Sequence, residues 1–188
     1  MPAFVSDLGR SDGTSYISVA QSDNWYLGTA REPDWAALTV PEKEAALMAA
    51  TFQLETLSYA GDRCSPSSDD PALPQALQWP RSNATCRGIA AACDMLPREV
   101  IGATAYLALE LHANPQPIGG GIVQATGPIQ SQTLGALSQS FYAPSSDATK
   151  VSPNAPLILQ RFPFLVDLLG CWSSTATGGS GLILRVRA

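Results

Sequence analysis

Proline residues limit where helices can run in this chain more than any other feature of the sequence. The 188 residues include 15 prolines, and a proline inside a helix removes a backbone hydrogen bond and clashes with the preceding turn. One long helical pattern begins at the capping box Thr39-Val40-Pro41-Glu42, and its natural stop is Gly61. A second pattern has Pro97 near its start and Pro115 just past its end. We therefore expect two main helices, over residues 40–60 and 97–113.

Apolar residues at helical spacing give each of these helices a face toward the core. In the first helix this face is formed by Leu47, Ala50, Leu54 and Leu57, widened by Met48, Phe52 and Tyr59. In the second it is formed by Val100, Ile101, Thr104, Leu107, Ala108 and Leu111. The opposite stripe of the second helix consists of Glu99, Gly102, Tyr106 and Glu110. The small residues Gly102, Ala103 and Ala105 would allow a neighbouring element to approach closely.

Shorter elements complete the predicted fold. A capping box at Ser18–Gln21 predicts a helix from about Val19 to Ala30, and a short last helix is expected from about Pro163 to Leu169. A Thr-Gly-Pro turn signal predicts a β-hairpin over about 118–142, and the apolar residues on it are Ile122, Val123, Ile129 and Leu134. The sequence thus predicts a mainly α fold, a small helical bundle with an inserted β-hairpin or arm and extended termini.

The chain divides into three predicted parts. Residues 1–13 form an N-terminal arm, residues 14–172 a helical domain with a long loop at 61–96, and residues 173–188 a flexible C-terminal arm. The loop carries an anchor, Trp79-Pro80-Arg81, whose indole we expect to insert into the core.

The charge of the chain is uneven. The net charge is −5; residues 1–113 carry 14 acidic and 7 basic residues, and residues 114–188 carry 2 acidic and 4 basic residues. Residues 111–146 contain no charged side chain, and they either line a lumen or form an interface. An acidic body argues against tight, salt-dependent binding of nucleic acid, so we expect no useful affinity for single-stranded DNA at physiological salt.

Residues suited to catalysis are scarce, and the sequence predicts no catalytic, metal or cofactor site. His112 is the only histidine, no carboxylate is nominated to orient it, and it fits better as a residue capping the C-terminal end of a helix. No secretion signal and no membrane span is evident, so Cys64, Cys86, Cys93 and Cys171 are interpreted as reduced thiols. A Cys86–Cys93 bridge stays open as an alternative. This pattern indicates a binding or structural protein and not an enzyme.

The order of motifs resembles that of tailed-bacteriophage head–tail adaptor (connector) proteins, a group also labelled DnaT-like. The motifs that carry the resemblance are "GTSYISVAQSDNWY", "EKEAALMAATFQLETL", "LQWPR", "LPREVIGATAYLALEL", "GPIQSQTL" and "FPFLVDLLGCW". Together they span roughly residues 13–172.

The resemblance implies a structural virion protein of the neck. It would form a dodecameric ring below the portal protein, assembled in the host cytoplasm and located at the head–tail junction. The ring would extend the DNA channel, let genomic DNA pass without specific binding, and offer a platform for tail or neck proteins. The alternative is a single-stranded-DNA-binding module, which needs a basic groove lined with aromatic residues, and the sequence shows none.

The C-terminal end has the composition of a flexible linker followed by a short strand. After the glycine-rich linker come Leu182, Ile183, Leu184, Arg185, Val186 and Arg187. Their alternation fits a strand that adds to a partner, and the resemblance makes the portal that partner. The alternative is that this strand completes the chain's own hairpin.

Overall fold

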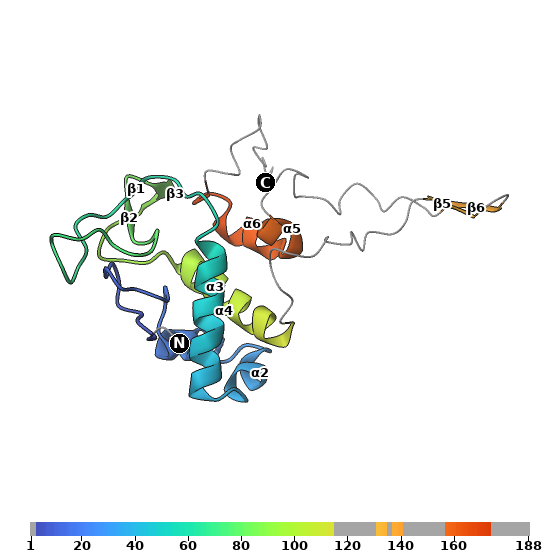
Figure 1. Cartoon of the computed structure of the whole chain (residues 1–188), viewed down its shortest axis with the longest axis horizontal. Helices are drawn as coiled ribbons and strands as arrows, with labels where there is room; N and C mark the ends of the chain where they lie inside the picture. The colour runs from blue at the N-terminus through green and yellow to red at the C-terminus, as the bar shows by residue number, and fades with distance from the viewer. Residues whose placement is uncertain (1–2, 115–130, 135–136, 141–156, 174–188) are drawn as a thin grey trace.

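Two long helices lie at the centre of the structure, a computed structural model that describes residues 3–114, 131–134, 137–140 and 157–173 (Figure 1). Helices α3 (Val40–Leu54) and α4 (Arg98–Ala113) pack against each other. The shorter helices α1 (Val19–Tyr26) and α6 (Phe164–Leu169) both pack on α4. The remaining helices are α2 (Glu32–Ala36), which follows α1, and α5 (Leu157–Arg161), which precedes α6.

The predicted helix starts are confirmed, and two predicted helix ends lie too far along the chain. Both capping boxes form, with Ser18 at the start of α1 and Thr39 at the start of α3. Helix α1 ends at Tyr26 because Gly28 takes a positive φ of 76° just after the cap, which turns the chain away. Helix α3 ends at Leu54, and the Tyr59 hydroxyl donates a hydrogen bond of 3.1 Å to the Leu54 carbonyl oxygen.

The core faces of the two long helices are largely as predicted. Leu47, Ala50, Leu54 and Leu57 are all buried. On α4 the predicted inward positions are buried too, except Ile101, which is half-buried. Phe52 was expected to widen the core and does not, because its side chain is 70% exposed on the outer face of α3.

The prediction of a mainly α bundle is wrong, because the described residues combine helices with short antiparallel strand pairs. Strand β1 (Asp62–Arg63) pairs with β2 (Arg81–Ser82), and β3 (Thr85–Cys86) pairs with β4 (Ile89–Ala90). Both pairs lie in the proline-rich segment that was expected to be only loop. Prolines prevent a helix there, so part of the backbone satisfies its hydrogen bonds by short ladders instead.

A third strand pair lies within the predicted hairpin region 118–142. Strand β5 (Ser131–Leu134) pairs with β6 (Leu137–Ser140), with Leu134 opposite Leu137. The connection between these strands falls at residues 135–136, so the predicted Thr-Gly-Pro turn at 126–128 does not join them. Ile122, Val123 and Ile129 lie outside the described residues.

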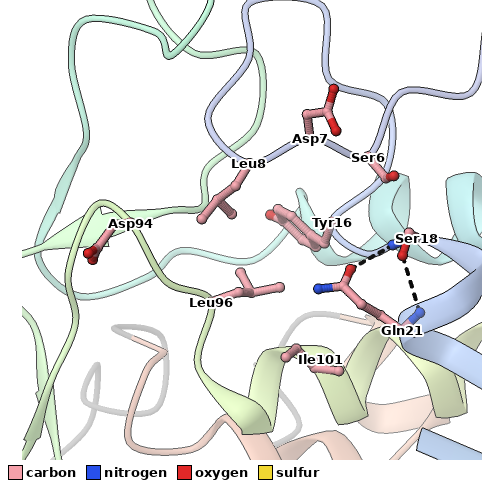
Figure 2. A pocket seen from close by; sticks show the side chains of 9 residues that line it. All are labelled: Ser6, Asp7, Leu8, Tyr16, Ser18, Gln21, Asp94, Leu96 and Ile101. Atoms are coloured by element: carbon pink, nitrogen blue, oxygen red, sulfur yellow. Dashed lines mark hydrogen bonds between the residues drawn. The ribbon is translucent and has the colours of Figure 1, made fainter. Parts of the chain in front are cut away.

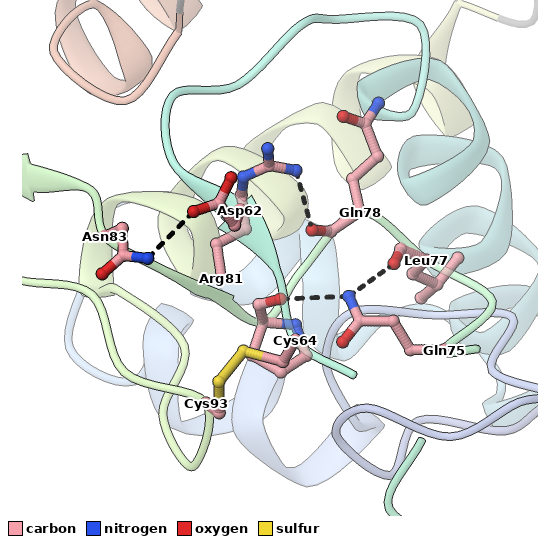
Figure 3. Close-up of a disulfide and its surroundings, with 9 residues drawn as sticks. Asp62, Cys64, Gln75, Leu77, Gln78, Arg81, Asn83 and Cys93 are labelled. Atoms are coloured by element: carbon pink, nitrogen blue, oxygen red, sulfur yellow. Dashed lines mark hydrogen bonds between the residues drawn. A yellow bond between two sulfur atoms is a disulfide. The ribbon is translucent and has the colours of Figure 1, made fainter. Parts of the chain in front are cut away.

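The loop anchor at 79–81 is placed in the interior. Trp79 is 1% exposed and meets the rings of Tyr59 and Trp172 edge to face, with centroids 5.5 and 5.6 Å away. Arg81 is also buried, and its guanidinium donates to the carbonyl oxygens of residues 59, 60, 61 and 78. Burial lowers the pKa of this guanidinium, and the carbonyl contacts take the place of water around it (Figure 3).

The interpretation of the four cysteines as reduced thiols is wrong. Cys64 is bonded to Cys93, and Cys86 is bonded to Cys171, with Cα–Cα distances of 5.6 and 5.4 Å (Figure 3 shows the first pair). The alternative Cys86–Cys93 bridge is therefore wrong as well. Four cysteines allow three pairings, and only the path of the folded chain selects one of them. The second bridge ties the segment of β3 to the chain just after α6.

Residues 3–13, predicted as an arm, are hydrogen-bonded to other segments. The backbone amide of Ser68 donates to the Gly9 carbonyl, and that of Ala76 donates to the Arg10 carbonyl. The amide and hydroxyl of Ser11 both donate to Asp69, and these bonds hold the pKa of Asp69 at about 2. The predicted C-terminal arm, including residues 182–187, lies outside the described residues, and the predicted domain boundaries stay a prediction.

Candidate functional site

In the part of the chain that the structure describes, no three His, Cys, Asp or Glu side chains lie close enough together to hold a metal ion. His112 is exposed in the last turn of α4. Across the same ranges, none of the helices combines the length and the apolar character needed to span a bilayer.

One surface hollow is polar and acidic. It measures about 420 Å³ and lies between the N-terminal segment, the start of α1 and the segment before α4 (Figure 2). Its lining consists of Ser6, Asp7, Leu8, Tyr16, Ser18, Gln21, Asp94, Leu96 and Ile101. Two carboxylates and no basic side chain line it, so it does not suit an anionic ligand.

A row of aromatic rings crosses α1, α4 and the start of α6. We call Trp25, Tyr106, Phe164 and Phe162 the aromatic row. Successive ring centroids are 6.0, 6.2 and 6.0 Å apart, and each pair meets edge to face. Trp25, Tyr106 and Phe164 are half-buried, and Phe162 is buried.

Gly102 makes the first contact of this row possible. A Cβ atom at Gly102 would lie 2.5 Å from Cζ2 and 2.7 Å from Cη2 of Trp25. The indole of Trp25 therefore lies directly against the backbone of α4, at a place where any side chain would displace it. The predicted approach of a neighbour at Gly102 is confirmed, and the neighbour is Trp25.

An arginine lies over the ring at each end of the aromatic row. The guanidinium of Arg98 is 5.5 Å from the centroid of Trp25, and that of Arg161 is 5.1 Å from the centroid of Phe162. Arg98 forms no salt bridge with any of the described residues, and Arg161 donates to the Asn114 carbonyl oxygen at 3.2 Å. Cation–π contact holds each guanidinium beside a ring while its edge can still meet an anion.

A second hollow opens between the two middle rings of the row. It measures about 390 Å³ and is lined by Arg31, Tyr106, Glu110, Phe164, Asp167 and Leu168. Arg31 Nη1 donates to Glu110 Oε1 at 2.9 Å, and Arg31 Nε donates to Asp34 Oδ2 at 3.0 Å. The bond to Glu110 raises the pKa of the Arg31 guanidinium, which stays charged.

Rings and guanidinium groups in this arrangement are suited to flat, partly anionic ligands. Aromatic faces stack on nucleobases whatever their identity, and arginine contacts phosphate or the base itself. The sequence showed no basic groove lined with aromatic residues, and the structure adds two arginines that lie beside aromatic rings. The row went unseen in the sequence because its members come from three distant segments, around residues 25, 98–106 and 161–164.

A family described as "Putative DnaT-like ssDNA binding protein" matches residues 1–185. No curated protein and no solved structure matches the chain.

This match corrects the resemblance to head–tail adaptors, because the family is described by single-stranded-DNA binding and not as a connector. The dodecameric ring, the portal and neck partners and the passage of DNA without binding are corrected with it. The location at the head–tail junction of a virion stays a prediction.

Proposed function

The chain belongs to the family of DnaT-like single-stranded-DNA-binding proteins, and from this membership we propose that it binds single-stranded DNA. The observation that carries the proposal is the aromatic row with Arg98 and Arg161 at its two ends. Bases would stack against the exposed parts of the rings, and the two arginines would contact the phosphates that link the stacked bases. We further propose that the protein is a binding module and not an enzyme.

The acidic composition decides which force would dominate this binding. Many described basic side chains already have partners: Arg10 and Lys43 contact carboxylates, and Arg63 and Arg81 donate to backbone carbonyls. Among the described residues few cations are left for phosphate, so we expect counterion release from them to contribute little. Stacking on aromatic rings contributes about 1–3 kcal/mol per base and does not depend on net charge. We therefore expect moderate affinity with a shallow salt dependence.

The role of Arg98 can be tested against a matched arginine. Arg87 is exposed at the β3–β4 turn, outside the aromatic row, so Arg87→Gln and Arg98→Gln remove the same charge at two places. The assay is the anisotropy of a labelled oligothymidylate of about twelve nucleotides, a length that matches known single-strand sites. Arg98→Gln should weaken binding roughly fivefold, equivalent to about 1 kcal/mol for one cation contact, and Arg87→Gln should leave it unchanged. Equal losses in both variants would show that only the overall charge matters and would remove the assignment to this surface.

A further inference from the structure

The hollow between Tyr106 and Phe164 combines apolar walls with carboxylate groups. The rings of Tyr106 and Phe164 have centroids 6.2 Å apart and planes inclined by 70°, and Leu168 lies one turn beyond Phe164 on α6. These three side chains give the hollow apolar walls. At about 390 Å³, it falls in the size range of small-ligand sites.

The polar groups of this hollow exclude phosphate. Glu110 and Asp167 bring two carboxylates to the lining, against the single guanidinium of Arg31. A phosphate placed here would be repelled by both carboxylates, whereas the uncharged base of a nucleotide would not. The hollow therefore fits the part of a nucleotide that carries N–H donors.

Arg31 leaves one donor available beside these carboxylates. Its Nε and Nη1 atoms bond to Asp34 and Glu110, and its Nη2 atom makes no hydrogen bond to any of the described residues. The carboxylate of Glu110 is held in place by Arg31 and is 30% exposed at its side chain. The Glu110 carboxylate, which can accept two hydrogen bonds, therefore lies beside Arg31 Nη2, which can donate one.

We propose that this hollow is a guanine-binding subsite, an inference that rests on the proposed binding of single-stranded DNA. Guanine presents N1–H and N2–H₂ side by side, and one carboxylate can accept from both. Its O6 atom, next to N1–H, can accept from Arg31 Nη2. Adenine and cytosine place an acceptor nitrogen beside their amino group, and thymine places a carbonyl on each side of N3–H. Each of those three bases would set a lone pair against the Glu110 carboxylate.

Oligonucleotides that differ at one base test the proposal on the full chain. The probes are an oligothymidylate of about twelve nucleotides and the same strand with one central thymine replaced by guanine, adenine, cytosine or hypoxanthine. The single guanine should tighten binding about tenfold, since a good bidentate base contact discriminates by roughly 5- to 150-fold. Hypoxanthine lacks the N2 amino group and should lose most of this gain. Adenine and cytosine should bind as thymine does.

Glu110→Gln provides the matching change in the protein. The amide oxygen cannot accept two donors as a carboxylate does, so the guanine and thymine strands should bind this variant within about twofold of each other. The readout is therefore the ratio of guanine-strand to thymine-strand affinity within this variant, compared with the same ratio in the wild type. Glu44→Gln, on α3 and outside the hollow, is the control and should keep the guanine preference. Thermal unfolding of each variant checks that the fold is retained.

The outcomes separate this inference from the proposed function. If the wild-type protein binds all five strands equally, the guanine subsite is refuted and the single-stranded-DNA proposal stands. If Glu110→Gln keeps the full guanine preference, the subsite is refuted as well, because guanine is then recognised elsewhere. If no strand binds, both proposals fail together.

Discussion

Replacing Gly102 with alanine should change the stability of the protein through two opposing effects, a gain in helix propensity and a steric clash with Trp25. In an exposed helix, Gly→Ala stabilises by up to about 1 kcal/mol, because alanine loses less backbone freedom on folding. At Gly102, however, the new Cβ atom would lie 2.5 Å from Cζ2 and 2.7 Å from Cη2 of Trp25. Those atoms belong to a rigid ring, so the indole must move away from α4 or the helices must separate.

Overpacking of this kind costs about 1–3 kcal/mol, so after the gain of about 1 kcal/mol the net effect should be a loss of up to about 2 kcal/mol. The melting temperature should fall by up to roughly 8 °C for a chain of this size. Affinity for oligothymidylate should also fall, because the Trp25 ring, over which the Arg98 guanidinium lies, would be displaced. Differential scanning calorimetry and the anisotropy titration measure the two effects.

Gly13→Ala is the matched control for this change. The atoms nearest to a Cβ at Gly13 belong to Arg10 and Leu77, at an ordinary distance of 3.6 Å, so this variant should be neutral or slightly more stable. If Gly102→Ala were as stable as Gly13→Ala and bound DNA normally, the close contact of Trp25 with α4 would be refuted.

Three further predictions concern stability. Trp79→Ala should cost about 3–5 kcal/mol in urea unfolding, because a buried indole that contacts two other rings is lost; an unchanged midpoint would refute its role as the loop anchor. Replacing both Cys86 and Cys171 with serine should lower the free energy of unfolding by up to about 4–5 kcal/mol, because their bridge spans 85 residues. Thiol titration of the unreduced wild type should find no free cysteine. Titratable thiols would contradict the pairing. The folded-state pKa of Asp69 is lowered to about 2, so its hydrogen bonds from Ser11 stabilise the protein above about pH 4 and are lost as the pH falls from about 4 to 2. The difference in melting temperature between the wild type and Asp69→Asn should shrink over that window. A constant difference would argue against this role of Asp69.

Local signals in the sequence were sufficient for the long helices and for part of the site. Capping boxes locate helix starts because they depend only on residues within one turn, as at Ser18 and Thr39. The stripe of Gly102, Tyr106 and Glu110 on α4 was predicted from helical spacing alone, and it supplies two lining residues of the hollow and the contact point of Trp25.

The remaining features depend on contacts between distant segments, which periodicity does not encode. Arg31 reaches Glu110 across 79 residues, and Phe164 meets Tyr106 from the far end of the described chain. The pairing of Cys86 with Cys171 is equally non-local. The charge count describes the whole chain, whereas the proposed binding would depend on the few arginines that lie beside aromatic rings.

The most direct test of single-stranded-DNA binding on the aromatic row is a titration of labelled oligothymidylate at several salt concentrations. Phe164→Ala removes a ring of the row, and Phe52→Ala removes an equal ring that is exposed on the outer face of α3. We predict a dissociation constant on the order of micromolar for the wild type, and a slope of log K against log salt of about −1.4 for two phosphate contacts. Phe164→Ala should weaken binding at least about fivefold, and Phe52→Ala should not. Absence of binding at protein concentrations on the order of 100 µM, or equal affinity in the two variants, would contradict the account.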